Sequence, residues 1–179
     1  GQRKIRVLHL NDLPPPPLPL TLVLALPRPN MLKRTLLNVT AMGVKEIVLL
    51  HSAKVEKSYW QTPWLENSAI REQLILGLEQ GCDTKLPEIF IKKRFKPFVE
   101  DELPNLVTDT QAFVAHPIGG IPCPLALNTP TTLAVGPEGG FIDYEINKFI
   151  ETGFQSISLG SRILRVETAV PVLLSKLYS

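Results

Sequence analysis

Two glycine-containing segments in the second half of the 179-residue chain carry residue types that suit ligand binding. In the first, LAVGPEGGFIDYE, an apolar run ends in Gly136–Gly140 and an amphipathic stretch follows. Glycines let a backbone approach a ligand closely and adopt positive φ, and a proline fixes the turn. The amides at the start of a following helix add a slightly positive rim. This segment therefore predicts a turn that contacts a ligand.

Glu138 lies inside this turn, before the predicted helix, and is a candidate functional residue. Asp143 and Glu145 suit the helix start for dipole and capping reasons, so we expect structural roles for them. The chain contains neither GxxxxGK[ST] nor a GxGxxG after its first predicted strand. The turn also offers no lysine to a phosphate, which disfavours a nucleotide triphosphate or a dinucleotide as the ligand.

The second segment, LGSRILRVETA, places Arg162 and Arg165 on either side of an Ile-Leu pair, after a glycine turn. Paired arginines beside such a turn would bind RNA phosphates or position a base. The alternative is that both are solvated loop charges and that Glu167-Thr168 only begins a helix. His116 follows another predicted strand, and a lone histidine there is more often structural than catalytic.

Composition and cysteine usage indicate one ordinary globular domain. The chain is 44% hydrophobic and 20% charged with a net charge of +2, which neither requires nor excludes a nucleic-acid partner. Cys82 and Cys123 match no metal-binding spacing, so free thiols and no metal are expected. The apolar run Leu18–Leu26 is too short to cross a membrane and no signal-peptide core follows the first residues, so the cytoplasm is the expected location.

Strand-like and helix-like patterns alternate along the chain and must position these segments. Buried strands are predicted at 20–26, 46–50, 88–91, 111–115, 131–135 and 156–159, and helices at about 30–42, 68–80, 143–152 and 166–178. Asn30 is expected to cap the first helix and Ile150 to be buried in the third. The alternation favours an α/β domain with a mostly parallel sheet, in which ligands bind outside the carboxyl ends of strands.

GPEGGF followed by LGSRILRVETA resembles the paired signature of the RsmE family, 16S ribosomal RNA methyltransferases of the SPOUT superfamily that act on N3 of a uridine. The resemblance runs from about Leu20 to the end, through LEQGCDTKLPEI. It implies S-adenosyl-L-methionine as cofactor, a C-terminal trefoil knot and a homodimer.

The N-terminal residues differ from the rest. Pro14–Pro17 and Pro19 predict a stiff polyproline connector, and the residues before it are too few for a domain. Because the family carries an N-terminal PUA-like barrel, the resemblance implies that residues 1–19 are its remnant and a connector. The alternative is a frayed terminus. Residues 20–179 are then the SPOUT methyltransferase domain.

The resemblance also implies roles for individual residues. The implied cofactor-binding residues are His116, Gly136, Pro137, Glu138, Gly139, Gly140, Leu159, Gly160, Ile163, Leu164 and Thr168. Arg162 or Arg165 would stabilise charge on the uracil oxygens. Glu138 or Glu167 would orient an arginine or accept the N3 proton, and a base need not be used at all.

Basic residues with interleaved aromatics are the candidate contacts to 16S ribosomal RNA or the small ribosomal subunit. They are Arg28, Lys33, Arg34, Lys54, Lys92, Lys93 and Arg94. The stretches that contain Lys54 and Lys92–Arg94 read equally well as solvated surface. Two other functions stay open: a SPOUT enzyme that methylates another base position or a ribose 2'-hydroxyl, and a knotted RNA-binding module without turnover.

Overall fold

The computed structural model describes residues 4–6 and 13–178. Its centre is a seven-stranded sheet of order β3-β2-β1-β6-β4-β7-β5, in which every neighbouring pair is parallel. The strands are β1 Leu20–Ala25, β2 Glu46–Leu50, β3 Glu88–Lys92, β4 Gln111–Ala115, β5 Ile121–Pro122, β6 Thr131–Val135 and β7 Gln155–Ser158. The predicted α/β class with a parallel sheet is confirmed.

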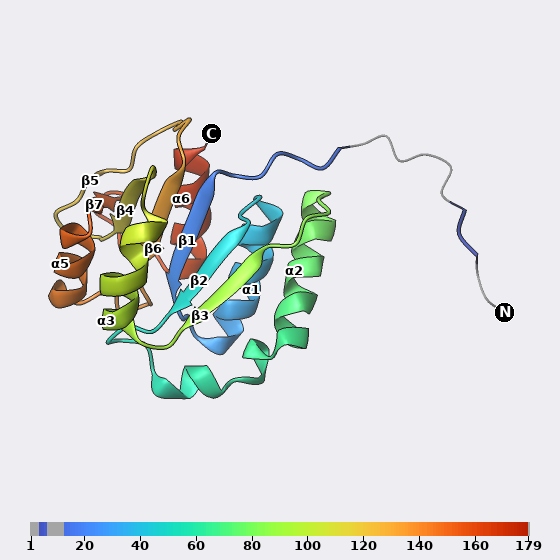
Figure 1. Cartoon of the computed structure of the whole chain (residues 1–179), viewed down its shortest axis with the longest axis horizontal. Coiled ribbons are helices and arrows are strands. Elements are labelled where there is room, and N and C mark those ends of the chain that lie inside the picture. The colour runs from blue at the N-terminus through green and yellow to red at the C-terminus, as the bar shows by residue number, and fades with distance from the viewer. Residues whose placement is uncertain (1–3, 7–12, 179) are drawn as a thin grey trace.

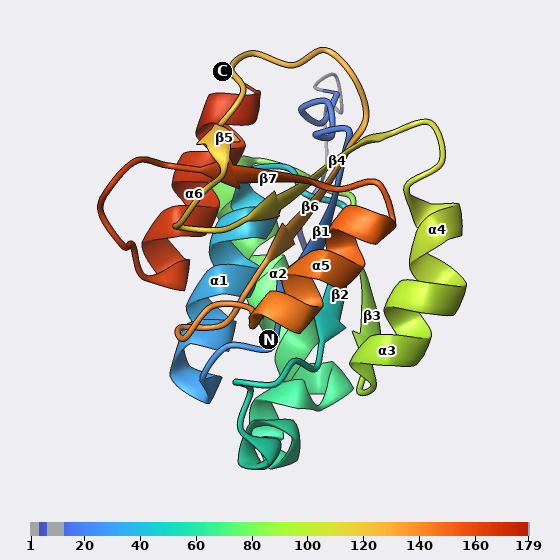
Figure 2. The same cartoon turned by 90° about the vertical axis from the view of Figure 1, so that its left-hand side faces the viewer.

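Helices cover both faces of the sheet and make a three-layered domain (Figures 1 and 2). One face carries α1 Pro29–Ala41, α2 Asn67–Gly81 and α6 Val166–Leu177. The other carries α5 Asp143–Glu151 and a helical segment made of α3 Phe95–Pro97, η3 Phe98–Glu102 and α4 Leu103–Leu106. Two short 3-10 helices, η1 Lys57–Gln61 and η2 Pro63–Leu65, follow β2.

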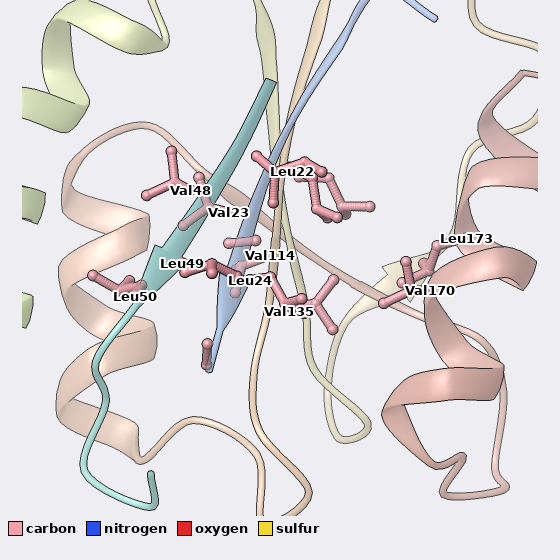
Figure 3. Close-up of a cluster of buried hydrophobic side chains, with 14 of the residues drawn as sticks. Leu22, Val23, Leu24, Val48, Leu49, Leu50, Val114, Val135, Val170 and Leu173 are labelled. Carbon is pink, nitrogen blue, oxygen red and sulfur yellow. The ribbon is translucent and has the colours of Figure 1, made fainter. Parts of the chain in front are cut away.

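The core lies between the central strands and the helices, as the close-up in Figure 3 shows. Leu22 and Leu24 of β1 are fully buried, because β1 has strands on both sides and helices on both faces. Val170 and Leu173 bring α6 against the same cluster and are also fully buried. Full burial of each such side chain stabilises the fold by about 1.5–3 kcal/mol.

Three details differ from the sequence prediction. The strand β3 is not buried on both faces: it forms one edge of the sheet and leaves Phe90 41% exposed. Asn30 does not cap α1, because Pro29 opens the helix and Arg28 holds the N-cap position. Ile150 is 49% exposed, because α5 buries the faces that carry Ile146 and Phe149 instead.

Hydrogen bonds join the end of α6 to distant parts of the chain. The Tyr178 hydroxyl donates to the carbonyl of Pro19, 3.0 Å away, just before β1. The amides of Ala126 and Leu127, in the connection from β5 to β6, donate to the carbonyls of Lys176 and Leu177. The last helix is therefore bound to both the start of the sheet and the loop that leads into β6.

The predicted connector, residues 14–19, has no regular secondary structure and is exposed apart from Leu18. The Leu18 amide donates to the carbonyl of Gly43, which fixes the chain at the entry to β1. Most of the predicted N-terminal remnant, residues 1–3 and 7–12, lies outside the described residues.

A nearly buried ion pair ties the loop after α2 to the start of β2. Lys45 Nζ donates to Asp83 Oδ2, and the side chains are 11% and 5% exposed. Burial alone would raise the pKa of Asp83, but the Lys45 hydrogen bond and the amides of Thr84 and Lys85 outweigh it and lower that pKa below its ordinary value.

Asp83→Asn is expected to lower the free energy of unfolding by about 1–3 kcal/mol at pH 7, because Lys45 loses its charged partner. A carboxylate whose pKa is lower in the folded state stabilises the fold at pH values above its unfolded pKa of about 3.9. This contribution is lost as the pH falls through the folded-state pKa. Urea unfolding should thus show the variant converging with the wild type at acidic pH. Glu79→Gln, an exposed carboxylate on α2, is the control. A difference that does not change with pH would contradict the assignment.

Candidate functional site

The register of the sheet brings the chemically unusual segments to one edge. Val135 at the end of β6 pairs with Leu24 of β1 and with Ala115 of β4, and Ala115 pairs with Ile157 of β7. Because parallel strands end at the same edge, the loops that follow β1, β4, β6 and β7 leave the sheet side by side. The two glycine-containing segments are thus neighbours.

A cavity of about 640 Å³ lies at this edge, a size typical of pockets for small molecules. Three loops and the first turns of α6 form its walls. The lining residues are 115–118, 135–143, 157–160 and 162–164, with Lys54, Val166, Ala169 and Leu173.

The glycine turn, residues 136–140, folds back on itself at the cavity wall. The Gly140 amide donates to the carbonyl of Pro137 at 2.7 Å, and Gly140 has a φ of +73° that favours glycine. A Cβ at Gly136 would lie only 2.9 Å from the Phe141 amide nitrogen. The turn therefore needs glycine for its own geometry, and its backbone groups form part of the wall.

Side chains from two other loops contact the glycine turn. Lys54 Nζ, from the loop after β2, donates to the carbonyl of Gly139 at 2.7 Å. Arg28 Nε lies 4.0 Å from Glu138 Oε1, a partly solvated pair that contributes little energy. Lys54, which we predicted as an RNA contact, thus lies at the cavity. No local pattern signals this, because the contact joins residues 85 apart through the order of the strands.

The structure brings most of the predicted cofactor-binding residues together. Thr168 does not line the cavity. The other ten do: His116, Gly136, Pro137, Glu138, Gly139, Gly140, Leu159, Gly160, Ile163 and Leu164. Of the predicted catalytic residues, Glu138 and Arg162 line the cavity. Arg165 and Glu167 do not: they lie at the start of α6, with Arg165 Nη1 4.0 Å from Glu167 Oε1.

His116 directly follows β4, and its backbone and its ring are in different situations. Its backbone amide donates to the carbonyl of Ile157 at 2.9 Å, which continues the sheet ladder. Its ring nitrogen Nδ1 is buried and has no hydrogen-bond partner in the part of the chain that the structure describes.

The remaining candidate RNA contacts lie away from the cavity. Lys33 Nζ sits 3.8 Å from the centre of the Trp64 ring, and Lys93 Nζ lies 5.9 Å from that of Trp60. The Lys92 ammonium pairs with Glu102 at 2.6 Å. Arg34 and Arg94 are exposed.

Among residues 4–6 and 13–178, no group of three or more His, Cys, Asp and Glu side chains is arranged to hold a metal ion. No helix in these ranges is long and apolar enough to cross a membrane. Both cysteines are free thiols, as expected; burial raises the pKa of the Cys123 thiol.

A family described as an RNA methyltransferase domain matches residues 14–178. The chain is 30% identical over 158 residues to the ribosomal RNA small subunit methyltransferase E of Treponema pallidum. That match covers 80% of the chain and 55% of the relative, so the chain spans little more than half of the relative's length.

Solved structures share the fold. The ribosomal RNA small subunit methyltransferase E of Neisseria gonorrhoeae bound to S-adenosyl methionine superposes with a TM-score of 0.73 at 22% identity, over 92% of this chain and 66% of that one. A Legionella pneumophila protein assigned as a methyltransferase, in complex with the cofactor SAM, gives a TM-score of 0.69 at 25% identity, over 88% of this chain and 65% of that one.

Gly136→Ala is expected to lower the free energy of unfolding by about 1–3 kcal/mol, because the new Cβ meets backbone that cannot move independently. Gly139→Ala is the matched control, since the nearest atoms to its Cβ all belong to the flexible side chain of Lys54 and none to the backbone. Chemical unfolding of both variants measures the difference. Equal stability of the two would contradict this geometry of the turn.

Proposed function

The chain belongs to the RNA methyltransferase domain family, and we propose that it methylates N3 of a uridine in 16S ribosomal RNA with S-adenosyl-L-methionine as the methyl donor. The observation that carries the proposal is the cavity, whose walls are formed by the glycine turn and the segment 159–164. The relative from T. pallidum, named as a small-subunit ribosomal RNA methyltransferase, supports the choice of substrate.

The cavity fits the proposed donor. Its volume of about 640 Å³ falls in the range that encloses a ligand of nucleoside size or larger. Backbone groups of the glycine turn and of residues 159–160 offer hydrogen bonds, and Ile163, Leu164 and Leu173 offer apolar contact. The buried Nδ1 of His116 stands unpaired in the described part of this wall. The complex of the L. pneumophila protein with SAM also supports this donor.

The donor supplies a methyl group on a positively charged sulfur. In the proposed reaction, uridine N3 would lose its proton to Glu138 or to solvent and take the methyl group, and the donor would leave as a neutral thioether. The walls of the cavity would hold the reacting atoms in line, and such alignment lowers a barrier by several kcal/mol.

Arg162 is the arginine that lines the cavity, so we assign it the stabilisation of negative charge on the uracil oxygens. Glu138 also lines the cavity, and its carboxylate lies 4.0 Å from Arg28 Nε. It would accept the N3 proton or orient an arginine. Arg165 and Glu167 flank Val166, which lines the cavity, but do not line it themselves, so they would contact a bound nucleotide only at the rim.

RNA would approach along the edge where the strands end. Arg28, Lys54 and Arg162 come from three different loops at this edge and are exposed. Further from the cavity, Lys93 and Arg94 follow β3 and extend the positive surface. A uridine must be unstacked to reach the cavity, which fits a single-stranded or looped target. Because the proposed substrate is ribosomal RNA, we place the proposed activity in the cytoplasm.

We further propose the knot and the homodimer that the sequence resemblance implies. The hydrogen bonds of Ala126 and Leu127 to the last turn of α6 support a C-terminal segment enclosed by the preceding loop. Large apolar side chains exposed near α6 support an interface between two copies: Ile118 is 74% exposed, Leu125 65% and Ile163 79%. Residues 20–179 would then be the catalytic domain.

Gly139→Val is expected to abolish binding of S-adenosyl-L-methionine without unfolding the domain. The larger side chain would occupy the cavity wall and displace Lys54, whose Cδ lies 2.6 Å from the position of a Cβ. Isothermal titration calorimetry measures the affinity, and circular dichroism checks the fold. Gly139→Ala should weaken binding less. Full affinity of the valine variant would show that the donor binds elsewhere.

The target is tested in a bacterial strain that lacks this protein. Mass spectrometry of nucleosides from its 16S ribosomal RNA should show loss of N3-methyluridine, because the proposed reaction is the one that places this methyl group. A plasmid copy should restore the nucleoside, and a Gly139→Val copy should not. An unchanged level in the deletion strain would rule out this target.

A further inference from the structure

Glu145 is a buried carboxylate, 2% exposed, that does not line the cavity. Its Oε1 accepts a hydrogen bond from the Ile142 amide at 3.0 Å, and its Oε2 accepts one from the Ala53 amide at 2.9 Å. The first bond is ordinary helix capping, in which an acid in the first turn of α5 reaches back to the N-cap amide. Capping does not explain the second bond, which joins residues 92 apart.

The partner of this second bond is a turn after β2, residues 52–55, which we name the β2 turn. The Val55 amide donates to the carbonyl of Ser52 at 3.0 Å, and both residues are buried. Lys54, from the same turn, donates to the carbonyl of Gly139. The β2 turn therefore holds the segment between β6 and α5 at two places: at its glycines and at the start of the helix.

We infer that Glu145 is a positioning residue for the methyl-donor cavity, an inference that rests on the proposed function. Its carboxylate fixes the start of α5 against the β2 turn, and Ile142, which it holds, lines the cavity. Lys54, carried by the same β2 turn, then reaches Gly139. Glu145 thus sets the position of the wall without touching the ligand.

The wall needs such support because its outer part is exposed. Gly136 and Pro137 are buried, whereas Glu138 and Gly139 extend into solvent. A loop that must be ordered on binding lowers affinity, and a loop already held in place avoids that loss. Hydrogen bonds to an ionised group are stronger than those between neutral groups, so a buried carboxylate with two amide donors is well suited to this task.

Glu145→Gln separates the two roles of the side chain. Glutamine serves a capping box as well as glutamate does, so its oxygen can still accept from Ile142. Its NH₂ group then faces the Ala53 amide, and two donors meet where a hydrogen bond had been. The helix should form normally while the link to the β2 turn is lost.

The expected result is an affinity for S-adenosyl-L-methionine about tenfold weaker, as follows from loss of one hydrogen bond to a charged group. The KM for this donor should rise while kcat at saturating donor changes little, because the ligand itself orders the wall once it is bound. Hydrogen exchange of residues 51–56 should become faster. Calorimetry, steady-state kinetics and exchange mass spectrometry measure the three effects.

Glu151→Gln is the matched control, a carboxylate on the same helix that is 67% exposed and pairs with Lys148 at 3.4 Å. It should change neither affinity nor exchange. Lys54→Gln removes the other contact of the β2 turn and should also weaken binding. The fold-loss of affinity in the double variant should be smaller than the product of the fold-losses in the two single variants, because both hydrogen bonds join the same two segments.

A folded Glu145→Gln variant with wild-type affinity and KM would overturn the inference. If this variant fails to fold, Ala53→Pro decides the question, because it removes the amide that donates to Glu145 and leaves the capping bond to Ile142 in place. Unchanged affinity of a folded Ala53→Pro variant would overturn the inference. If the wild type does not bind S-adenosyl-L-methionine at all, the proposed function is wrong, whatever the role of Glu145. In that case exchange of residues 51–56 still tests the link, and unchanged exchange in Glu145→Gln would refute it.

Discussion

The hydrogen-bonded register of β6 between β1 and β4 determines where each loop of the cavity lies. Leu133 and Ala134 of β6 are completely buried, so both faces of the strand pack against apolar groups. A slip of one residue would exchange the faces of the whole strand, and the tight packing of the interior disfavours it. Because the strands cannot shift, the loops at their carboxyl ends keep fixed starting points. The glycine turn, the end of β4 and the segment after β7 converge for this reason alone.

Much of this arrangement could be predicted from the sequence, because buried parallel strands appear as short apolar runs. The bounds of β2, β4 and β6 agree with the prediction, and the unusual segments follow strands as expected. The helical segment 95–106 was not predicted, because Pro97 and Pro104 are residues that normally break a helix. Its apolar residues nevertheless recur at helical spacing, and Phe98, Val99 and Leu103 are buried. The β5 strand has only two residues and leaves no pattern.

The contacts between loops were also beyond prediction. Lys54 is predicted as an RNA contact or as solvated surface, and Glu145 as a structural acid at the start of a helix. Glu145 does cap α5, whereas the RNA contact of Lys54 stays a prediction. Their additional partners depend on β2 and β6 lying on either side of β1, which no local pattern encodes. The same geometry gathers Arg28, Lys54 and Arg162 at one edge of a chain whose net charge is only +2. The carboxylates of Glu138 and Asp143 line the same edge, so positive and negative side chains are mixed there.

The hydrogen bond from Tyr178 to Pro19 spans 159 residues and has a consequence for synthesis of the protein. Contacts between distant residues form late in folding, because a long stretch of chain must first be closed into a loop. The cavity also takes Val166, Ala169 and Leu173 from α6. A nascent chain on the ribosome can therefore pair β1, β2 and β3 early, but β4 must wait for β6, and the cavity is incomplete until α6 has emerged. The walls of the cavity are therefore complete only after α6 has been synthesised.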